Sequence, residues 1–221
     1  MSLPKCEVKT MVKRLVFLSF LSCIALFPLA AQNYKIEPIS AAAPGLPASL
    51  GSAIQDQGYR IVGPSGPWCE VWLAKSIPAG KSTDSSIAFG IPQGTLLGIL
   101  RFPGKGADRR GQVIPPGVYT IRYSNFPVDG AHQGAAPQRD FGLLTALADD
   151  TDPASKPAFD VLLAASRKAS GTPHPAVFSL ETPPQGAATP SVVKEGDHDW
   201  VLTAKAGDLT LSIIVVGKVE G

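Results

Sequence analysis

The sequence predicts a mainly β protein, an antiparallel β-sandwich or jelly-roll-like fold with one or two short helices. Short apolar or alternating segments recur from residue 59 to residue 219, and turn residues separate them. Glycine and proline, at 22 and 21 of 221 residues, are as frequent as a fold with many turns requires. Apolar residues make up 44% of the chain and charged residues 17%, which is enough for a sizeable core and argues against disorder.

Residues 1–31 have the composition of a secretory signal peptide. Lys13 and Arg14 precede an apolar run at 15–26, and small residues follow it. We expect cleavage after Ala31. The apolar run is short for a bilayer span, so the sequence predicts export to the periplasm or the extracellular space, with no membrane span after cleavage.

Without its first 31 residues the chain is almost neutral. That segment holds four of the 20 basic and one of the 18 acidic residues, which leaves 16 and 17 and a net charge of about −1. This balance gives no reason to expect a nucleic-acid partner. Cys69 is the one cysteine that remains, so we expect a buried apolar residue there and no internal disulfide.

The remaining chain divides into a flexible N-terminal segment, residues 32–45, and a single β-sandwich domain, residues 46–221. The first segment is rich in alanine and proline and predicts a loop. A short helix that Gly58 ends is expected at the start of the domain. It is indicated by apolar residues four positions apart, namely Leu46, Leu50 and Ile54.

Nine segments then have the pattern of strands, and turn residues separate them. In one of them the alternation places Tyr119, Ile121 and Tyr123 on one face and polar residues on the other. Gly207 lies in the expected hairpin turn between the last two strands. The expected strands are 59–63, 68–74, 86–91, 95–102, 115–126, 140–147, 176–180, 199–205 and 209–219.

One segment, 152–171, has the spacing of a helix instead. Its apolar residues recur three and four positions apart, as at Phe159 and Leu163. Asp152 or Ser155 is expected to cap its start, and Gly171 is expected to end it.

The connection at 127–139 is the best candidate for chemistry, because it is longer than a hairpin turn needs and such loops are often functional. Asp129 lies three positions before His132. The carboxylate could orient the imidazole as a base or share a metal ion with it, and Asp140 could supply a second carboxylate. The alternative is structural: Asp129 caps a turn, His132 bonds to the backbone, and Arg139 and Asp140 pair to close the loop.

The expected strand at 68–74 places Trp68, Glu70 and Trp72 on one face. Two flat indoles with a carboxylate between them are a workable surface for sugar rings. These residues form the candidate carbohydrate-binding surface, and Arg139 is a further candidate ligand-binding residue. The alternative is that another part of the chain covers this face and the tryptophans belong to the core.

Other charged groups have simpler explanations. Three aspartates within 149–152 could hold calcium, but they precede an expected helix, whose N-terminus favours acids. The basic turn at 101–110 could meet an acidic polysaccharide, although such runs are usually solvated loops. Three loop histidines could converge on zinc, but they lack the close spacing of a usual site: His132, His174 and His198. We therefore expect no cofactor, with a zinc or calcium ion as the alternative.

Two segments carry a resemblance to other proteins. PPGVYTIRY (115–123) and DGAHQGAAPQRDF (129–141) resemble the PxGxYxLRY and DGxHxGxxxxRDF segments of uncharacterised secreted bacterial proteins of the domain-of-unknown-function type. The similarity extends over about residues 46–216. It implies a secreted single domain. Because such families have no assigned activity, it implies no catalytic residue.

These observations favour a non-enzymatic binding module for an envelope or extracellular ligand, with carbohydrate as one class. The signal peptide, the strand pattern, the tryptophan pair and the lack of a complete catalytic motif all support it. One alternative is a metal-assisted or acid–base hydrolase centred on residues 127–140. A structural or assembly partner in the cell envelope is the other.

Overall fold

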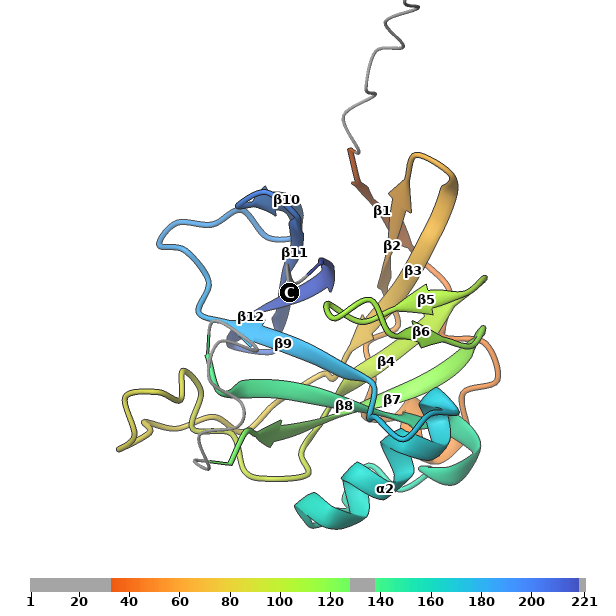
Figure 1. Ribbon diagram of the computed structural model, residues 1–221. Helices are drawn as coiled ribbons and strands as arrows, with labels where there is room; N and C mark the ends of the chain where they lie inside the picture. The colour runs from red at the N-terminus through yellow and green to blue at the C-terminus, as the bar shows by residue number, and fades with distance from the viewer. Residues whose placement is uncertain (1–32, 128–137, 219–221) are drawn as a thin grey trace, which may run out of the picture. The chain divides into compact units, whose positions relative to one another are not determined.

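The computed structural model describes residues 33–127 and 138–218, and it confirms the mainly β, sandwich- or jelly-roll-like class. Ten strands form one antiparallel sheet (Figure 1). In sheet order they are β1 (Lys35–Ile39), β2 (Gly58–Gly63), β3 (Gly66–Leu73), β4 (Leu96–Phe102), β7 (Gly117–Asn125), β8 (Asp140–Ala146), β9 (Val177–Glu181), β12 (Leu209–Val216), β11 (Asp199–Ala206) and β10 (Ser191–Glu195). The smaller elements are the hairpin of β5 (Gly106–Ala107) and β6 (Val113–Ile114), the helices α1 (Ala48–Gly51) and α2 (Phe159–Ser170), and the 3-10 turn η1 (Leu147–Asp149).

The large sheet curls so strongly that its first and last strands, β1 and β10, approach each other. Tyr34, beside β1, and Trp200 of β11 have ring centroids 5.3 Å apart. Farther in, the Trp68 indole of β3 donates a hydrogen bond of 2.8 Å to the Val215 carbonyl of β12. Strand twist, which accumulates across ten strands, makes this curvature possible. The inner face of the sheet therefore packs against itself and forms the main core.

The outer face of the sheet is covered in part by α2, which lies beside β8 (Figure 1). Residues of β8 alternate between the two faces: Leu144 belongs to the main core, whereas Phe141 and Leu143 pack with Leu162 of α2 in a second apolar cluster. Among the described residues, 33–127 and 138–218, no helix is long and apolar enough to cross a membrane.

Arg122 lies in the middle of β7 and is fully buried. Its guanidinium has five N–H groups, and each donates a hydrogen bond of 2.6–3.1 Å. The acceptors are both carboxylate oxygens of Asp150 and the carbonyls of Gly94, Asp152 and Ser155. The predicted alternation of β7 is correct, since Tyr119, Ile121 and Tyr123 join the core. The opposite face is also buried, because the segment that leads to α2 covers it.

The N-terminal part of the fold differs from the sequence-based expectation. Residues 35–39, expected in a flexible loop, form β1 and pair with β2. The helix expected to reach Gly58 ends at Gly51, because Ile54 forms a bridge with Ala74 at the end of β3. Gly58 begins β2, where an added Cβ would overlap the indole of Trp72. This close approach explains the glycine better than a helix end does.

Two further predicted elements differ from the structure: one strand does not form, and one helix begins later than expected. Residues 86–91 form no strand, because the N–H groups of Ala88 and Phe89 donate to the carboxylate of Asp140 instead of to a neighbouring strand. Helix α2 begins at Phe159, two residues after Pro157, and neither of the expected capping side chains reaches its first turn. Its predicted end is correct: Gly171 has φ 69° and donates to the carbonyls of the last turn.

We expect Arg122→Met to lower the free energy of unfolding by about 3–5 kcal/mol, because it leaves the nearly buried carboxylate of Asp150 without its partner. Denaturation in urea measures the loss. The control is Lys168→Met, which breaks an exposed ion pair with Asp149 and should cost less than about 1 kcal/mol. Equal losses in the two variants would contradict the role given to Arg122.

Candidate binding pocket

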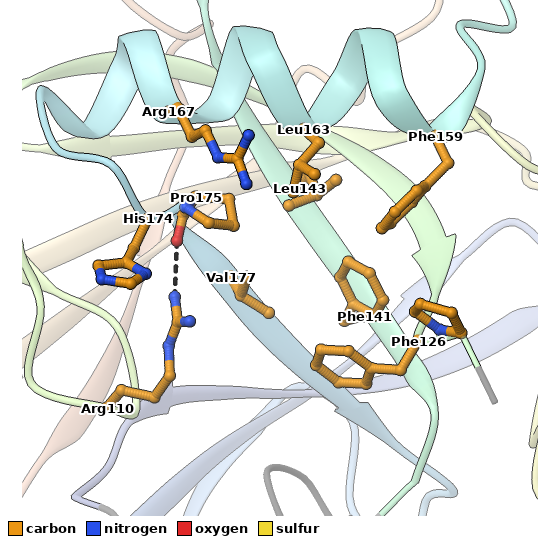
Figure 2. Close-up of a pocket in the computed structure, with 11 residues that line it drawn as sticks. Arg110, Phe126, Phe141, Leu143, Phe159, Leu163, Arg167, His174, Pro175 and Val177 are labelled. Carbon is orange, nitrogen blue, oxygen red and sulfur yellow. Dashed lines mark hydrogen bonds between the residues drawn. The ribbon is translucent and has the colours of Figure 1, made fainter. Parts of the chain in front are cut away.

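A pocket of about 330 Å³ lies on the outer face of the sheet, between α2 and the strands β8 and β9 (Figure 2). We call it the α2 pocket. It is lined by Arg110, Phe126, Pro127, Phe141, Leu143, Phe159, Leu163, Arg167, His174, Pro175 and Val177.

The apolar side of the α2 pocket comes from both layers. Phe126, which directly follows β7, and Phe141 of β8 stack with ring centroids 4.2 Å apart. Phe159 and Leu163 face them from α2, since residues four positions apart lie on the same side of a helix. Leu162, between them, points into the apolar cluster under the helix and is 2% exposed. The pocket is therefore an extension of this cluster that residues 33–127 and 138–218 leave unfilled.

The polar end of the α2 pocket is built around Arg110, which follows the β5 strand. Asp108 has no exposed side-chain surface, and it accepts hydrogen bonds from Arg110 Nε and Nη2 at 3.1 and 2.6 Å. Nη2 also donates to the carbonyl of Pro175, at 2.6 Å (Figure 2). The same aspartate accepts the backbone N–H groups of Arg110 and Gln112, so it fixes both the turn and the side chain. This leaves Nη1 of Arg110 without a partner among the described residues.

Arg167 and His174 complete this end (Figure 2). Arg167 lies in the last turn of α2, where a cation interacts favourably with the helix dipole. Within residues 33–127 and 138–218, its guanidinium has neither a hydrogen bond nor an ion pair. His174 follows the helix in a turn that Ser170 and Thr172 hold by hydrogen bonds to its backbone. Both side chains are exposed and available to a ligand.

The described lining of the α2 pocket is apolar with a nitrogen-rich end. Three of its side chains carry nitrogen groups, namely Arg110, Arg167 and His174, and all the others are apolar. No aspartate, glutamate, serine, threonine or cysteine is among the lining residues of the described chain.

Only part of the connection that we expected to carry chemistry, 127–140, belongs to the described residues. Asp129 and His132 lie outside the described residues. Asp140 is fully buried at the start of β8. Its carboxylate accepts hydrogen bonds from the Tyr123 hydroxyl at 2.6 Å and from two backbone N–H groups of the 80–92 segment. Burial, and after it the hydrogen bond with Asp140, raises the pKa of Tyr123 far above its ordinary value. Asp140 therefore holds in place the long connection between β3 and β4.

Arg139 does not pair with Asp140, although a clamp between them was one expectation. Its Nη1 donates to Asp84, and its Nε donates to the Phe126 carbonyl at 2.7 Å. Hydrogen bonds that the Ser86 hydroxyl and backbone N–H donate to Asp84 lower the pKa of the Asp84 carboxyl, and the charge and hydrogen bond of Arg139 lower it further. Arg139 and Asp140 thus both bind the 80–92 segment, from opposite sides of one strand end.

The expected carbohydrate surface is not exposed. Trp72 is 1% exposed, and its indole donates to the Ala41 carbonyl at 2.8 Å. Trp68 is half-buried against Phe102, and its indole is bound to β12. Glu70 is buried between Arg60 and Arg101, at 2.9 and 2.7 Å. A buried indole offers no face to a sugar ring, so these residues serve the core.

Several other charged residues that the sequence singled out are paired. Arg101 pairs with Glu70, and Arg109 pairs with Asp199. The three aspartates of 149–152 do separate work: Asp150 binds Arg122, Asp149 pairs with Lys168, and Asp152 accepts the Ala154 N–H group. Within the part of the chain that the structure describes, no three His, Cys, Asp or Glu residues are grouped as a metal site would need. Burial raises the pKa of the Cys69 thiol far above its ordinary value, which keeps it unreactive.

A pair of glutamates lies at the far end of β9 from the α2 pocket. Glu181 ends β9 and is half-buried beside Glu195, which ends β10. Burial, then the charge and hydrogen bond of Glu195, raises the pKa of Glu181 from 4.5 to about 7. Asp199 adds to this rise and Arg109 opposes it. Glu181 therefore keeps its proton in weakly acidic solution.

This proton makes stability depend on pH. Between pH 4.5 and about 7 the folded protein keeps a proton on Glu181 that the unfolded chain releases. The stabilisation is therefore complete below pH 4.5 and is lost as the pH rises to about 7. We expect the melting temperature to fall over this range in the wild type, and to fall less in Glu181→Gln. Glu37→Gln removes an exposed carboxylate of β1 and is the control, and identical profiles for all three proteins would contradict the assignment.

We expect Asp140→Asn to lower the free energy of unfolding by about 2–4 kcal/mol, because the new amide group turns hydrogen atoms toward buried donors. Denaturation in urea measures this loss. Asp149→Asn, at an exposed ion pair, should cost less than about 1 kcal/mol. An Asp140→Asn protein as stable as the wild type would contradict the structural role given to this carboxylate.

No protein-family model, no curated protein and no solved structure matches the chain.

Proposed function

We propose that this chain is an exported protein whose folded part is a non-enzymatic binding module for a small envelope or extracellular ligand. The signal-like composition of residues 1–31 supports export. The ligand site in this proposal is the α2 pocket.

The observation that carries the proposal is an open apolar cavity with a fixed polar end. Small-molecule sites are typically cavities of about 300–1,000 Å³ with apolar walls and a few oriented polar groups. The α2 pocket has this composition, and its volume of about 330 Å³ lies at the small end of the range. Its walls stand on rigid elements, since α2 and β8 share an apolar cluster. A preformed site of this kind binds without ordering the chain first.

The other expected functions have less support. Carbohydrate binding depended on Trp68 and Trp72, whose indoles are engaged with the backbone. The hydrolase hypothesis at 127–140 depended on Asp129, His132 and Asp140. The Asp140 carboxylate is buried and accepts structural hydrogen bonds instead.

Two tryptophan variants on α2 test the site. Leu163→Trp should fill the pocket, whereas Val161→Trp adds the same bulk to the exposed side of the helix, where Val161 is 56% exposed. Ligand-observed NMR with a mixed set of small acids, amines, neutral compounds and sugars measures binding. We expect ligands of the wild type to lose binding in Leu163→Trp and to keep it in Val161→Trp. Ligands that bind both variants equally well would place the site elsewhere and contradict the proposal.

A further inference from the structure

We propose that the α2 pocket selects small amphipathic carboxylates, compounds with one carboxylate and one compact apolar body. This inference rests on the proposed binding function and specifies its ligand. The carboxylate would lie between Arg110 and Arg167, and the apolar body between the phenylalanine rings and Leu163. Figure 2 shows this separation, with the cationic side chains at one end of the pocket and the aromatic side chains at the other.

The polar end presents donors to a ligand. A guanidinium has N–H groups and no acceptor. Nη1 of Arg110 and the whole guanidinium of Arg167 have no partner among the described residues, so both can donate. The Pro175 carbonyl is a backbone acceptor at this end, and it already accepts from Arg110 and from Gln112. An ammonium or a primary amide would find only this occupied carbonyl and one imidazole nitrogen of His174 as acceptors among the described lining residues, whereas a carboxylate would accept from two arginines.

The charge of the polar end favours a monoanion. Arg110 and Arg167 contribute two positive charges, and buried Asp108 contributes one negative charge. The sum of about +1 matches one carboxylate, and a phosphate dianion would leave excess negative charge near Asp108. Asp108 also holds Arg110 in place before the ligand arrives, so little side-chain entropy is lost on binding.

The size of the pocket restricts the apolar body. A volume of about 330 Å³ suits a single ring or a short acyl chain and is too small for an oligosaccharide or a folded peptide. Phe126 and Phe141 stack on each other and form the wall that such a body would contact, with Phe159 opposite. Burial of this body supplies apolar free energy, and the arginines supply the preference for an acid.

The test compares matched compounds that differ in their head group. The probes are 3-phenylpropionate and octanoate, their primary amides, 3-phenylpropylamine and 3-phenylpropyl phosphate, measured by titration calorimetry on the exported chain without residues 1–31. We expect at least one acid to bind about tenfold or more tightly than its amide, the amine and the phosphate, as charge-assisted hydrogen bonds predict.

Arg167→Gln is the decisive variant, because glutamine keeps the helix propensity and removes the charge. We expect it to weaken binding of the acid about tenfold and to leave the amide almost unchanged. Lys168→Gln removes a neighbouring charge that is paired with Asp149 outside the pocket, and acid binding should change less than about twofold. If Arg167→Gln and Lys168→Gln have equal effects, general electrostatic attraction explains the preference and the inference fails.

The results separate this inference from the function on which it rests. Amides, amines or phosphates that bind as well as the acids, and lose binding in Leu163→Trp, would overturn the ligand class and leave the binding function intact. If no probe binds and no ligand in the mixed set is sensitive to Leu163→Trp, both proposals fail.

Discussion

Every N–H group of the buried Arg122 guanidinium has an acceptor, and the elements on the outer face of the sheet depend on this side chain. It connects the centre of β7 to Gly94 on one side and to the segment containing Asp150 and Ser155 on the other. That segment leads directly into α2, whose inner side forms one wall of the pocket. A buried charge is costly unless it is fully paired, so the arrangement tolerates few alternatives. The position of α2 over the sheet is therefore fixed by a polar network as much as by apolar contacts.

Buried carboxylates repeat this role around the molecule. Asp140 holds the 80–92 segment, Glu70 joins β2 to β4, and Asp108 orders the turn after β5. Each accepts hydrogen bonds from backbone or arginine donors, which is how a folded chain satisfies groups that it removes from water. Polar residues that look chemical in the sequence are thus used for structure. Nη1 of Arg110 and the guanidinium of Arg167, in contrast, have no partner among the described residues and face a cavity.

Local patterns in the sequence predicted the elements that depend on local chemistry. Alternation in β7 and the glycine that ends α2 are correct, since strand facing and a left-handed C-cap are set by a few adjacent residues. The strand predicted at 86–91 and the loop predicted at 35–39 were both wrong, because distant partners decide the structure of these segments. The pocket was missed for the same reason: its lining comes from five separate stretches between Arg110 and Val177. Spacing on α2 gave one signal, in Phe159 and Leu163, but nothing in the sequence showed which strand they would face.

The place of β12 in the sheet has a consequence for how the molecule is made. Although it follows β9, β10 and β11 in the sequence, it lies between β9 and β11 and hydrogen-bonds to both. Until β12 has paired with them, β9 has an open edge and the pair β10–β11 has no bridge to the other strands. Open edges of this kind invite pairing with other chains. Pairing of β12 is therefore the step that protects β9 from association with other chains during folding.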